Sequence, residues 1–281
     1  MTASALVVTG ATGRIGGLVA SSLQSAGIDQ RLLVRDPGRL PERLRELPTS
    51  IATYGDGEAV HEALRGARIV LMVSAAESAD RLEHHLTFVD AATAAGVEHI
   101  VYTSFAGASP AATFLLARDH AATEQRIEAS GMRHTFLRDN LYLDYLPLLA
   151  GADGVVRGPA GRGRVAAVAQ CDVSAVAAAV LSDLGPHVNA TYDLTGPQAL
   201  TLDEAAATVR EVTGRDVTYH HESIEEAYAS RAGLGAQQWE LDAWVSTYTA
   251  IAAGELAPVS DHVERILGRP PLSLAEVLRH A

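Results

Sequence analysis

The sequence predicts an α/β fold: a doubly wound parallel sheet with helices on both faces, followed by a smaller C-terminal α/β lobe. Three observations predict it. Short apolar runs alternate with helix-like stretches through the first half of the chain, as in successive βαβ units. A glycine-rich turn, Gly10–Gly16, stands where the first apolar run passes into a helix. After Leu149 the alternation gives way to a glycine-rich stretch and then to mainly helical sequence.

The first six predicted strands are short, strand-like runs. They are Ala5–Thr9, Gln30–Val34, Ser50–Tyr54, Arg68–Val73, His99–Thr103 and His134–Leu137. A proline-free helix, Leu18–Ala26, follows the first of them. Leu82, Leu86 and Val89 recur at spacings of four and three, which predicts one apolar helical face. A further helix ends at Gly131.

The elements beyond residue 149 are predicted with a different pattern. They are a helix at Val173–Leu184, a strand at Ala190–Leu194, a helix from Leu202, a strand at Val217–His220 and mainly helical sequence from Ile224 to Ala281. Thr201 and Glu204 have the spacing of a capping box at the start of one of these helices. We therefore predict a sheet domain over residues 1–149 and a smaller, mainly helical lobe over residues 150–281, either appended to the sheet domain or interleaved with it.

The turn Gly10–Gly16 has the glycine spacing of a dinucleotide-binding turn. Gly10 permits the tight turn, Gly13 lets the backbone approach a pyrophosphate, and Gly16 lets the helix lie close on the strand. The helix N-terminus then faces the phosphate charge with free N–H groups. We predict a Rossmann-type NAD(P)-binding domain; the alternative is an ordinary tight turn. The turn residues expected to bind the cofactor are Gly10, Thr12, Gly13, Arg14, Ile15 and Gly16.

Arg35 follows the second predicted strand, where an acidic residue would bind ribose hydroxyls and favour NAD. An arginine suits the additional phosphate of NADP, because it offers full charge and bidentate hydrogen bonds. NADP is therefore the expected cofactor, with NAD as the alternative because Asp36 is adjacent. Arg14 and Arg39 are close enough in sequence to assist. The competing interpretation is that Arg35 is a solvated surface arginine.

Polar residues follow the other strands at the edge where ligands bind open parallel sheets. Asp56 follows the third strand and is predicted either to accept a hydrogen bond from the adenine or to cap the next helix. Ser74, Ser104 and Asn140 follow the fourth, fifth and sixth strands. We predict that they lie along the ribose and nicotinamide path.

The composition excludes several other classes of function. The net charge of −12 disfavours binding to nucleic acids or anionic membranes, and no run reaches the roughly 18 apolar residues of a membrane span. The single cysteine, Cys171, excludes an intramolecular disulfide and indicates a cytoplasmic protein. The adjacent pairs His84-His85 and His220-His221 lack helical metal-ligand spacing, so no metal site is predicted.

Several motifs spread over nearly the whole chain carry a family resemblance. They are Gly10–Gly16, Val34-Arg35-Asp36-Pro37, Tyr102-Thr103-Ser104, Ala117-Arg118-Asp119-His120 through Glu124, Phe136-Leu137-Arg138, Leu194-Thr195-Gly196-Pro197 and Gly268-Arg269-Pro270-Pro271. On these motifs the chain resembles the NmrA-like group of atypical short-chain dehydrogenases/reductases, and within it the bacterial type 2 NAD(P)H:quinone oxidoreductases. The resemblance implies hydride transfer from NADPH to a quinone or a similar electron-poor aromatic acceptor.

The chain contains no lysine, so the Tyr-x-x-x-Lys pair of classical members of the superfamily cannot exist here. Reduction of a quinone gives an anion with a pKa near that of a phenol, about 10, which needs only a weak proton donor. Tyr142 and His120 are the candidate catalytic donors, with Tyr145 and water as alternatives.

The missing pair also fits a second function, a non-catalytic NADP(H)-sensing regulator of the NmrA-like group. A reductase of the same fold that acts on a dye-like substrate is a third possibility. For each of them the expected ligand is a small molecule, and the chain is expected to be a monomer or a homodimer.

Overall fold

The computed structural model of the protein describes residues 5–280. The chain divides into two compact units whose segments interleave along the sequence. Unit 1 comprises residues 1–104, 119–138 and 173–192, and unit 2 comprises residues 105–118, 139–172 and 193–281. A single boundary at residue 149 does not describe this division, because the chain returns to unit 1 between Val173 and Tyr192.

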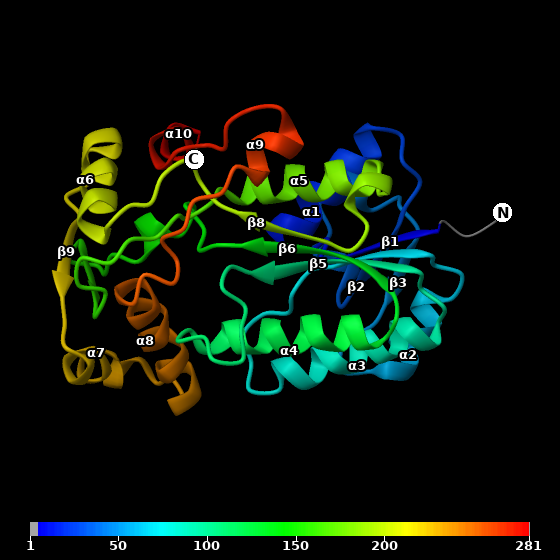
Figure 1. The fold of residues 1–281 in the computed structure, drawn as a ribbon, viewed down its shortest axis with the longest axis horizontal. Helices are drawn as coiled ribbons and strands as arrows, with labels where there is room; N and C mark the ends of the chain where they lie inside the picture. The colour runs from blue at the N-terminus through cyan, green and yellow to red at the C-terminus, as the bar shows by residue number, and fades with distance from the viewer. Residues whose placement is uncertain (1–4, 281) are drawn as a thin grey trace. The chain divides into compact units, whose positions relative to one another are not determined.

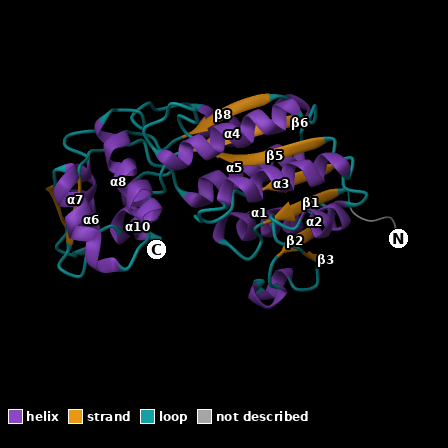
Figure 2. Ribbon diagram, turned by 90° about the horizontal axis from the view of Figure 1, so that it is seen from below, coloured by secondary structure: helices purple, strands orange, loops and turns teal. Residues whose placement is uncertain are grey.

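A seven-stranded sheet, in the order β3-β2-β1-β4-β5-β6-β8, forms the centre of the fold. Its strands are β1 (Leu6–Thr9), β2 (Arg31–Val34), β3 (Thr49–Ile51), β4 (Ile69–Met72), β5 (His99–Phe105), β6 (Arg133–Asp139) and β8 (Ala190–Leu194). Figure 2 shows them side by side, from β8 and β6 at one edge to β2 and β3 at the other. The pairs β1–β2, β1–β4, β2–β3 and β4–β5 are parallel. The predicted fold class is confirmed.

Five helices cover the two faces of this sheet. They are α1 (Arg14–Ser25), α2 (Gly57–Leu64), α3 (Arg81–Ala94), α4 (Leu115–Ala129) and α5 (Gln170–Ser182). Figure 1 shows α1 and α5 on one face and α2, α3 and α4 on the other. The core on the second face joins alternate strand residues, such as Val70 and Ile100, to Val60 of α2, Phe88 of α3 and Ile127 of α4. This alternation is the period-2 burial that a two-faced sheet requires.

The apolar face predicted for α3 is rotated in the structure. Val89 is buried as predicted, but Leu82 and Leu86 are only partly buried, whereas Arg81 and His85 are buried beside Phe88. Charged and polar residues are seldom enclosed unless their hydrogen bonds are satisfied. The contacts that satisfy Arg81 and His85 are described below.

Unit 2 contains a two-stranded parallel sheet and most of the remaining helices. Its elements are β7 (Val155–Gly158), β9 (Thr218–His221), α6 (Leu202–Thr213), α7 (Ile224–Arg231), α8 (Gln238–Ala252), α9 (His262–Leu267) and α10 (Leu274–Arg279). The capping box of Thr201 and Glu204 is confirmed. Strand β7 lies in the stretch predicted to be loop-rich. Its last residue is Gly158, and a Cβ there would lie 2.3 Å from the ring of Tyr248, so the close approach of this ring requires glycine.

Short 3₁₀ helices connect several of these elements. They are η1 (Pro37–Arg39), η2 (Glu42–Leu44), η3 (Leu146–Leu148), η4 (Gly185–His187) and η5 (Ala232–Leu234). None of the helices formed by residues 5–280 combines the length and apolar character that crossing a bilayer requires.

Candidate functional site

The glycine turn between β1 and α1 is built as its spacing predicts. Gly10 has φ of +67°, and a Cβ there would lie 2.9 Å from the side chain of Val73. A Cβ on Gly16 would lie 2.4 Å from the backbone of Gly10. The steric roles predicted for these two glycines, a left-handed turn and close packing of helix on strand, are therefore confirmed.

Gly13 differs from the other two glycines. A Cβ at this position would lie 3.4 Å from the Gly10 carbonyl oxygen, an ordinary contact, and the backbone there is extended with φ of −98°. Packing within the protein therefore does not require glycine at residue 13. Close approach of a ligand to the backbone is the reason that the sequence predicts for this glycine, and it stays a prediction.

The N-terminus of α1 has neither a side-chain cap nor an acidic residue that would compete with an anionic ligand. Gly13 is the N-cap and provides no side-chain cap, and the first turn contains no acidic residue. The helix start therefore supplies no anionic side chain of its own to face the positive end of the helix dipole. Thr12 is half-buried, Arg14 is exposed and Ile15 is buried in this segment. The donor set fits a diphosphate bridge.

Arg35 leaves the end of β2 as an exposed residue, and Arg39 is exposed in η1. The neighbouring Asp36 uses its carboxylate to accept a hydrogen bond of 2.9 Å from the Gly38 N–H. Within residues 5–280, neither the Arg35 nor the Arg39 guanidinium forms an ion pair or a hydrogen bond. Two exposed cations beside an acidic residue that is already engaged fit a phosphate better than a ribose diol.

The residues predicted at the β3 and β4 exits have different surroundings. Asp56 is the N-cap of α2, and its Oδ1 accepts a hydrogen bond of 3.0 Å from the Ala59 N–H. The capping alternative is therefore what the structure shows for Asp56, and its contact with adenine stays a prediction. Ser74 is half-buried directly after β4, and its N–H donates to Thr103 Oγ1 at 2.8 Å.

Ser104 and Asn140 are enclosed, each within its own unit. The Ser104 hydroxyl donates to Glu124 Oε1 at 2.5 Å, and Arg138 binds both oxygens of the same carboxylate. In unit 2, Asn140 donates to the Leu256 carbonyl at 3.0 Å through its amide nitrogen. Because these polar groups already have protein partners, the contacts with a cofactor that were predicted for Ser104 and Asn140 stay predictions.

The two candidate proton donors lie in different units. In unit 1, His120 is 5% exposed; its Nε2 accepts from Arg81 at 2.8 Å and its Nδ1 lies 2.8 Å from the Tyr102 hydroxyl. Burial and the Arg81 charge hold the pKa of His120 well below its ordinary value. A neutral imidazole with both nitrogens engaged can position its neighbours more readily than it can donate a proton.

In unit 2, the Tyr142 hydroxyl donates to Asp139 Oδ2 at 2.6 Å. Burial and the Asp139 carboxylate raise the pKa of Tyr142 well above its ordinary value, so the hydroxyl stays protonated at neutral pH. The ring of Tyr145 meets that of Tyr142 edge-on at 5.6 Å and is half exposed. This tyrosine pair gives unit 2 two neighbouring aromatic rings, one half-buried and one exposed.

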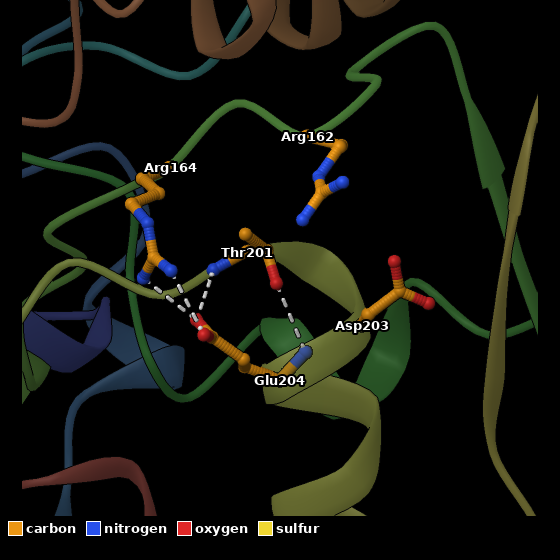
Figure 3. Close-up of a pocket in the computed structure, with 5 residues that line it drawn as sticks. All are labelled: Arg162, Arg164, Thr201, Asp203 and Glu204. Carbon is orange, nitrogen blue, oxygen red and sulfur yellow. Dashed lines mark hydrogen bonds and ion pairs between the residues drawn. The ribbon is translucent and has the colours of Figure 1, made fainter.

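Unit 2 also contains a shallow pocket over the start of α6 (Figure 3). It is lined by Arg162, Arg164, Thr201, Asp203 and Glu204. Arg164 binds both oxygens of the Glu204 carboxylate, at 2.8 and 2.9 Å, and Glu204 also closes the capping box with Thr201. Three of the lining residues, Arg164, Thr201 and Glu204, are thus paired with one another, and helix capping explains the contacts between Thr201 and Glu204.

Comparison with known proteins agrees with this geometry. A family model described as NAD(P)H-binding matches residues 10–184. Quinone oxidoreductase 2 of Escherichia coli strain K12 is 32% identical over 283 residues, covering 98% of this chain and 98% of the relative. An NAD(P)H azoreductase of Xenophilus azovorans is 32% identical over 275 residues, covering 96% of each chain. The crystal structure of the NADPH-dependent quinone oxidoreductase from E. coli in complex with NADPH matches with a TM-score of 0.88 at 32% identity, covering 98% of this chain and 99% of that chain.

Proposed function

This chain belongs to the NAD(P)H-binding family, and from that premise we propose that it reduces quinones or related electron-poor aromatic compounds with NADPH. Its relatives are oxidoreductases that use nicotinamide cofactors, and the chain is an enzyme of this kind. The acceptor and the preference for NADPH are the proposed parts.

The observation that carries the proposal is the open start of α1. Gly10 and Gly16 are required by the fold, whereas Gly13 is not, and no side chain caps the helix. A dinucleotide diphosphate is the ligand for which this arrangement is suited, because it needs both backbone donors and the absence of a Cβ.

Preference for NADPH follows from the chemistry at the β2 exit. Arg35 offers an exposed guanidinium, and Asp36 has already committed a carboxylate oxygen to the Gly38 N–H. Arg35→Ala is expected to raise the Kd for NADPH by about tenfold or more, because one charge-assisted phosphate contact is lost. The Kd for NADH is expected to change little. Isothermal titration with both dinucleotides measures this. Equal losses for both would contradict the assignment of Arg35 to the extra phosphate.

In this proposal the residues of the chain orient the reactants, and the reaction does not need a strong acid as proton donor. The bound cofactor supplies the hydride. The chain has no lysine to lower the pKa of a tyrosine, and Tyr142 has a raised pKa beside Asp139. A simple ketone would need a strong donor for its alkoxide, whereas a quinone yields an anion near the acidity of phenol, with a pKa of about 10.

Anaerobic mixing of the protein with NADPH and an acceptor panel tests the proposal. The panel contains a benzoquinone, an azo dye and a simple ketone, each with a protein-free control. We expect oxidation of NADPH with the benzoquinone well above background, and little with the ketone. Tight NADPH binding without turnover of any acceptor would refute the reductase proposal and favour a regulatory protein that senses NADP(H).

A further inference from the structure

The backbone directly after β4 forms hydrogen bonds with side chains rather than with the backbone of neighbouring strands. Residues Val73, Ser74 and Ala75 lie beyond the end of the strand. The Val73 N–H donates to Thr9 Oγ1 at 2.9 Å, the Ser74 N–H donates to Thr103 Oγ1 at 2.8 Å, and the Ala75 N–H donates to His85 Nε2 at 2.9 Å. Three consecutive backbone donors therefore each have a different side-chain acceptor.

Two carbonyl groups of the same segment are held in the same way. The Tyr54 hydroxyl donates to the Val73 carbonyl at 2.7 Å, and Arg81 Nε donates to the Ala75 carbonyl at 3.0 Å. His85 and Arg81 thus hold both sides of Ala75 from one helix, α3. We name this set of side chains the β4-exit clamp; it consists of Thr9, Tyr54, Arg81, His85 and Thr103.

A buried network fixes the two α3 residues of the clamp. Arg81 is 4% exposed; it contacts Asp119 Oδ2 at 3.2 Å and donates to His120 Nε2 at 2.8 Å. His85 is fully buried, with its Nδ1 3.1 Å from the Thr123 hydroxyl.

The donors around the two histidines determine their tautomers. The Ala75 N–H and the Arg81 guanidinium can only donate, so Nε2 of His85 and Nε2 of His120 must both accept. Each ring is therefore neutral, with its proton on Nδ1. The clamp has one protonation state in which all its hydrogen bonds are made.

The strand order places the clamp on one side of the cofactor site. The order β2-β1-β4 reverses direction at β1, and open sheets of this kind bind a dinucleotide across that reversal. The glycine turn follows β1, and Arg35 at the β2 exit is assigned to the adenosine half. The nicotinamide half then belongs to the β4 side, where the clamp holds residues 73–75.

We propose that the β4-exit clamp positions Val73–Ala75 for the nicotinamide half of the cofactor, with His85 and Arg81 as positioning residues. This inference rests on the proposed function. A turn of three residues at a sheet edge is ordinarily hydrated, and burial of an arginine and a histidine is costly unless every group is paired. The Ser74 hydroxyl, at the centre of the clamped segment, makes no hydrogen bond within residues 5–280 and is available to a ligand.

The test compares two ligands that share the adenosine half. NADPH carries the nicotinamide, whereas 2′-phospho-ADP-ribose lacks it. In His85→Leu, which leaves the Ala75 N–H without an acceptor, the Kd for NADPH is expected to rise about tenfold, and that for 2′-phospho-ADP-ribose to stay within about twofold. His85→Gln, with an amide oxygen near the position of Nε2, is expected to recover most of the lost affinity.

A second pair of variants tests the clamp without changing α3. Thr103→Val removes the acceptor of the Ser74 N–H with little change in volume, and Thr103→Ser keeps it. We expect the valine variant, but not the serine variant, to lose NADPH affinity selectively. This pair decides the question if His85→Leu does not fold.

The outcomes separate the inference from the proposed function. Equal weakening of both ligands, or weakening of neither, in His85→Leu and Thr103→Val would overturn the positioning role. A wild-type protein that bound neither ligand would refute the proposed function itself.

Discussion

Lowering the pH is expected to destabilise this protein through its buried histidines. Burial, with the nearby Arg81 charge, lowers the pKa of His85 to about 3, and burial beside Arg133 lowers that of His99 to about 4. In the unfolded chain each imidazole takes up a proton near pH 6.5, whereas in the folded chain each stays neutral to a lower pH. The unfolded state therefore binds more protons, and stability is lost as the pH falls from about 6.5 toward about 4.

The size of the loss follows from this difference. At about pH 5 the medium is about 1.5 pH units below the unfolded pKa and still above both folded values, so each histidine costs about 2 kcal/mol, or about 4 kcal/mol together. His120, whose pKa is also lowered, adds in the same direction. Hydrogen bonds from Arg68 lower the pKa of Glu98, so this carboxylate does not offset the loss.

Urea denaturation at a series of pH values and constant ionic strength measures the effect. The free energy of unfolding is expected to fall by at least about 4 kcal/mol between about pH 7.5 and pH 5. In His85→Gln the dependence on pH is expected to be shallower by about one proton. A free energy that stayed constant over this interval, or an identical slope in the variant, would show that these imidazoles are not held neutral by the fold.

Other substitutions test separate parts of the structure. Gly16→Ala is expected to destabilise the fold by about 3 kcal/mol or more, because the new Cβ would lie 2.4 Å from the Gly10 backbone. Gly13→Ala is the matched control. It is expected to change the free energy of unfolding by about 1 kcal/mol or less, and to raise the Kd for NADPH, measured by titration, by about tenfold or more. Arg269→Ala removes the ion pair of 2.7 Å to the fully buried Asp172 and is expected to lower the free energy of unfolding in urea by about 2 kcal/mol. Tyr142→Phe is expected to lower kcat for a benzoquinone by less than about tenfold in stopped-flow experiments, and a loss of about a hundredfold would instead identify Tyr142 as the general acid.

The sheet and the cofactor turn were predictable because their signals are local. A strand such as Leu6–Thr9 is short and fully buried, and the capping box of Thr201 and Glu204 depends on two residues three positions apart. The strand Ala190–Leu194 was also predicted from a short segment. The local pattern did not reveal to which sheet this strand belongs. It was predicted among the elements of the C-terminal lobe, but it is the edge strand β8 of the seven-stranded sheet. Pairing with β6 depends on a chain segment about 55 residues away, which no window of local sequence contains.

The buried face of α3 was missed for a related reason. Hydrophobic periodicity assigns burial from the character of each side chain alone, so it predicts that Leu82 and Leu86 are buried rather than Arg81 and His85. Burial of a polar side chain is decided by its partners, and here those partners are the Ala75 backbone, Asp119 and His120.

The adjacent histidines show how such a face can be recognised. His84, half-buried, pairs with Asp80, the N-cap residue of the same helix, whereas His85 reaches the backbone beyond β4. A polar residue in register with Phe88 and Ala92, on the buried side of a helix, either destabilises the protein or holds something in place. In this chain the segment that His85 holds follows β4, the strand next to the one that leads into the glycine turn. Under our proposal, the cost of burying His85 is offset by the fixed position that it gives this segment at the cofactor site.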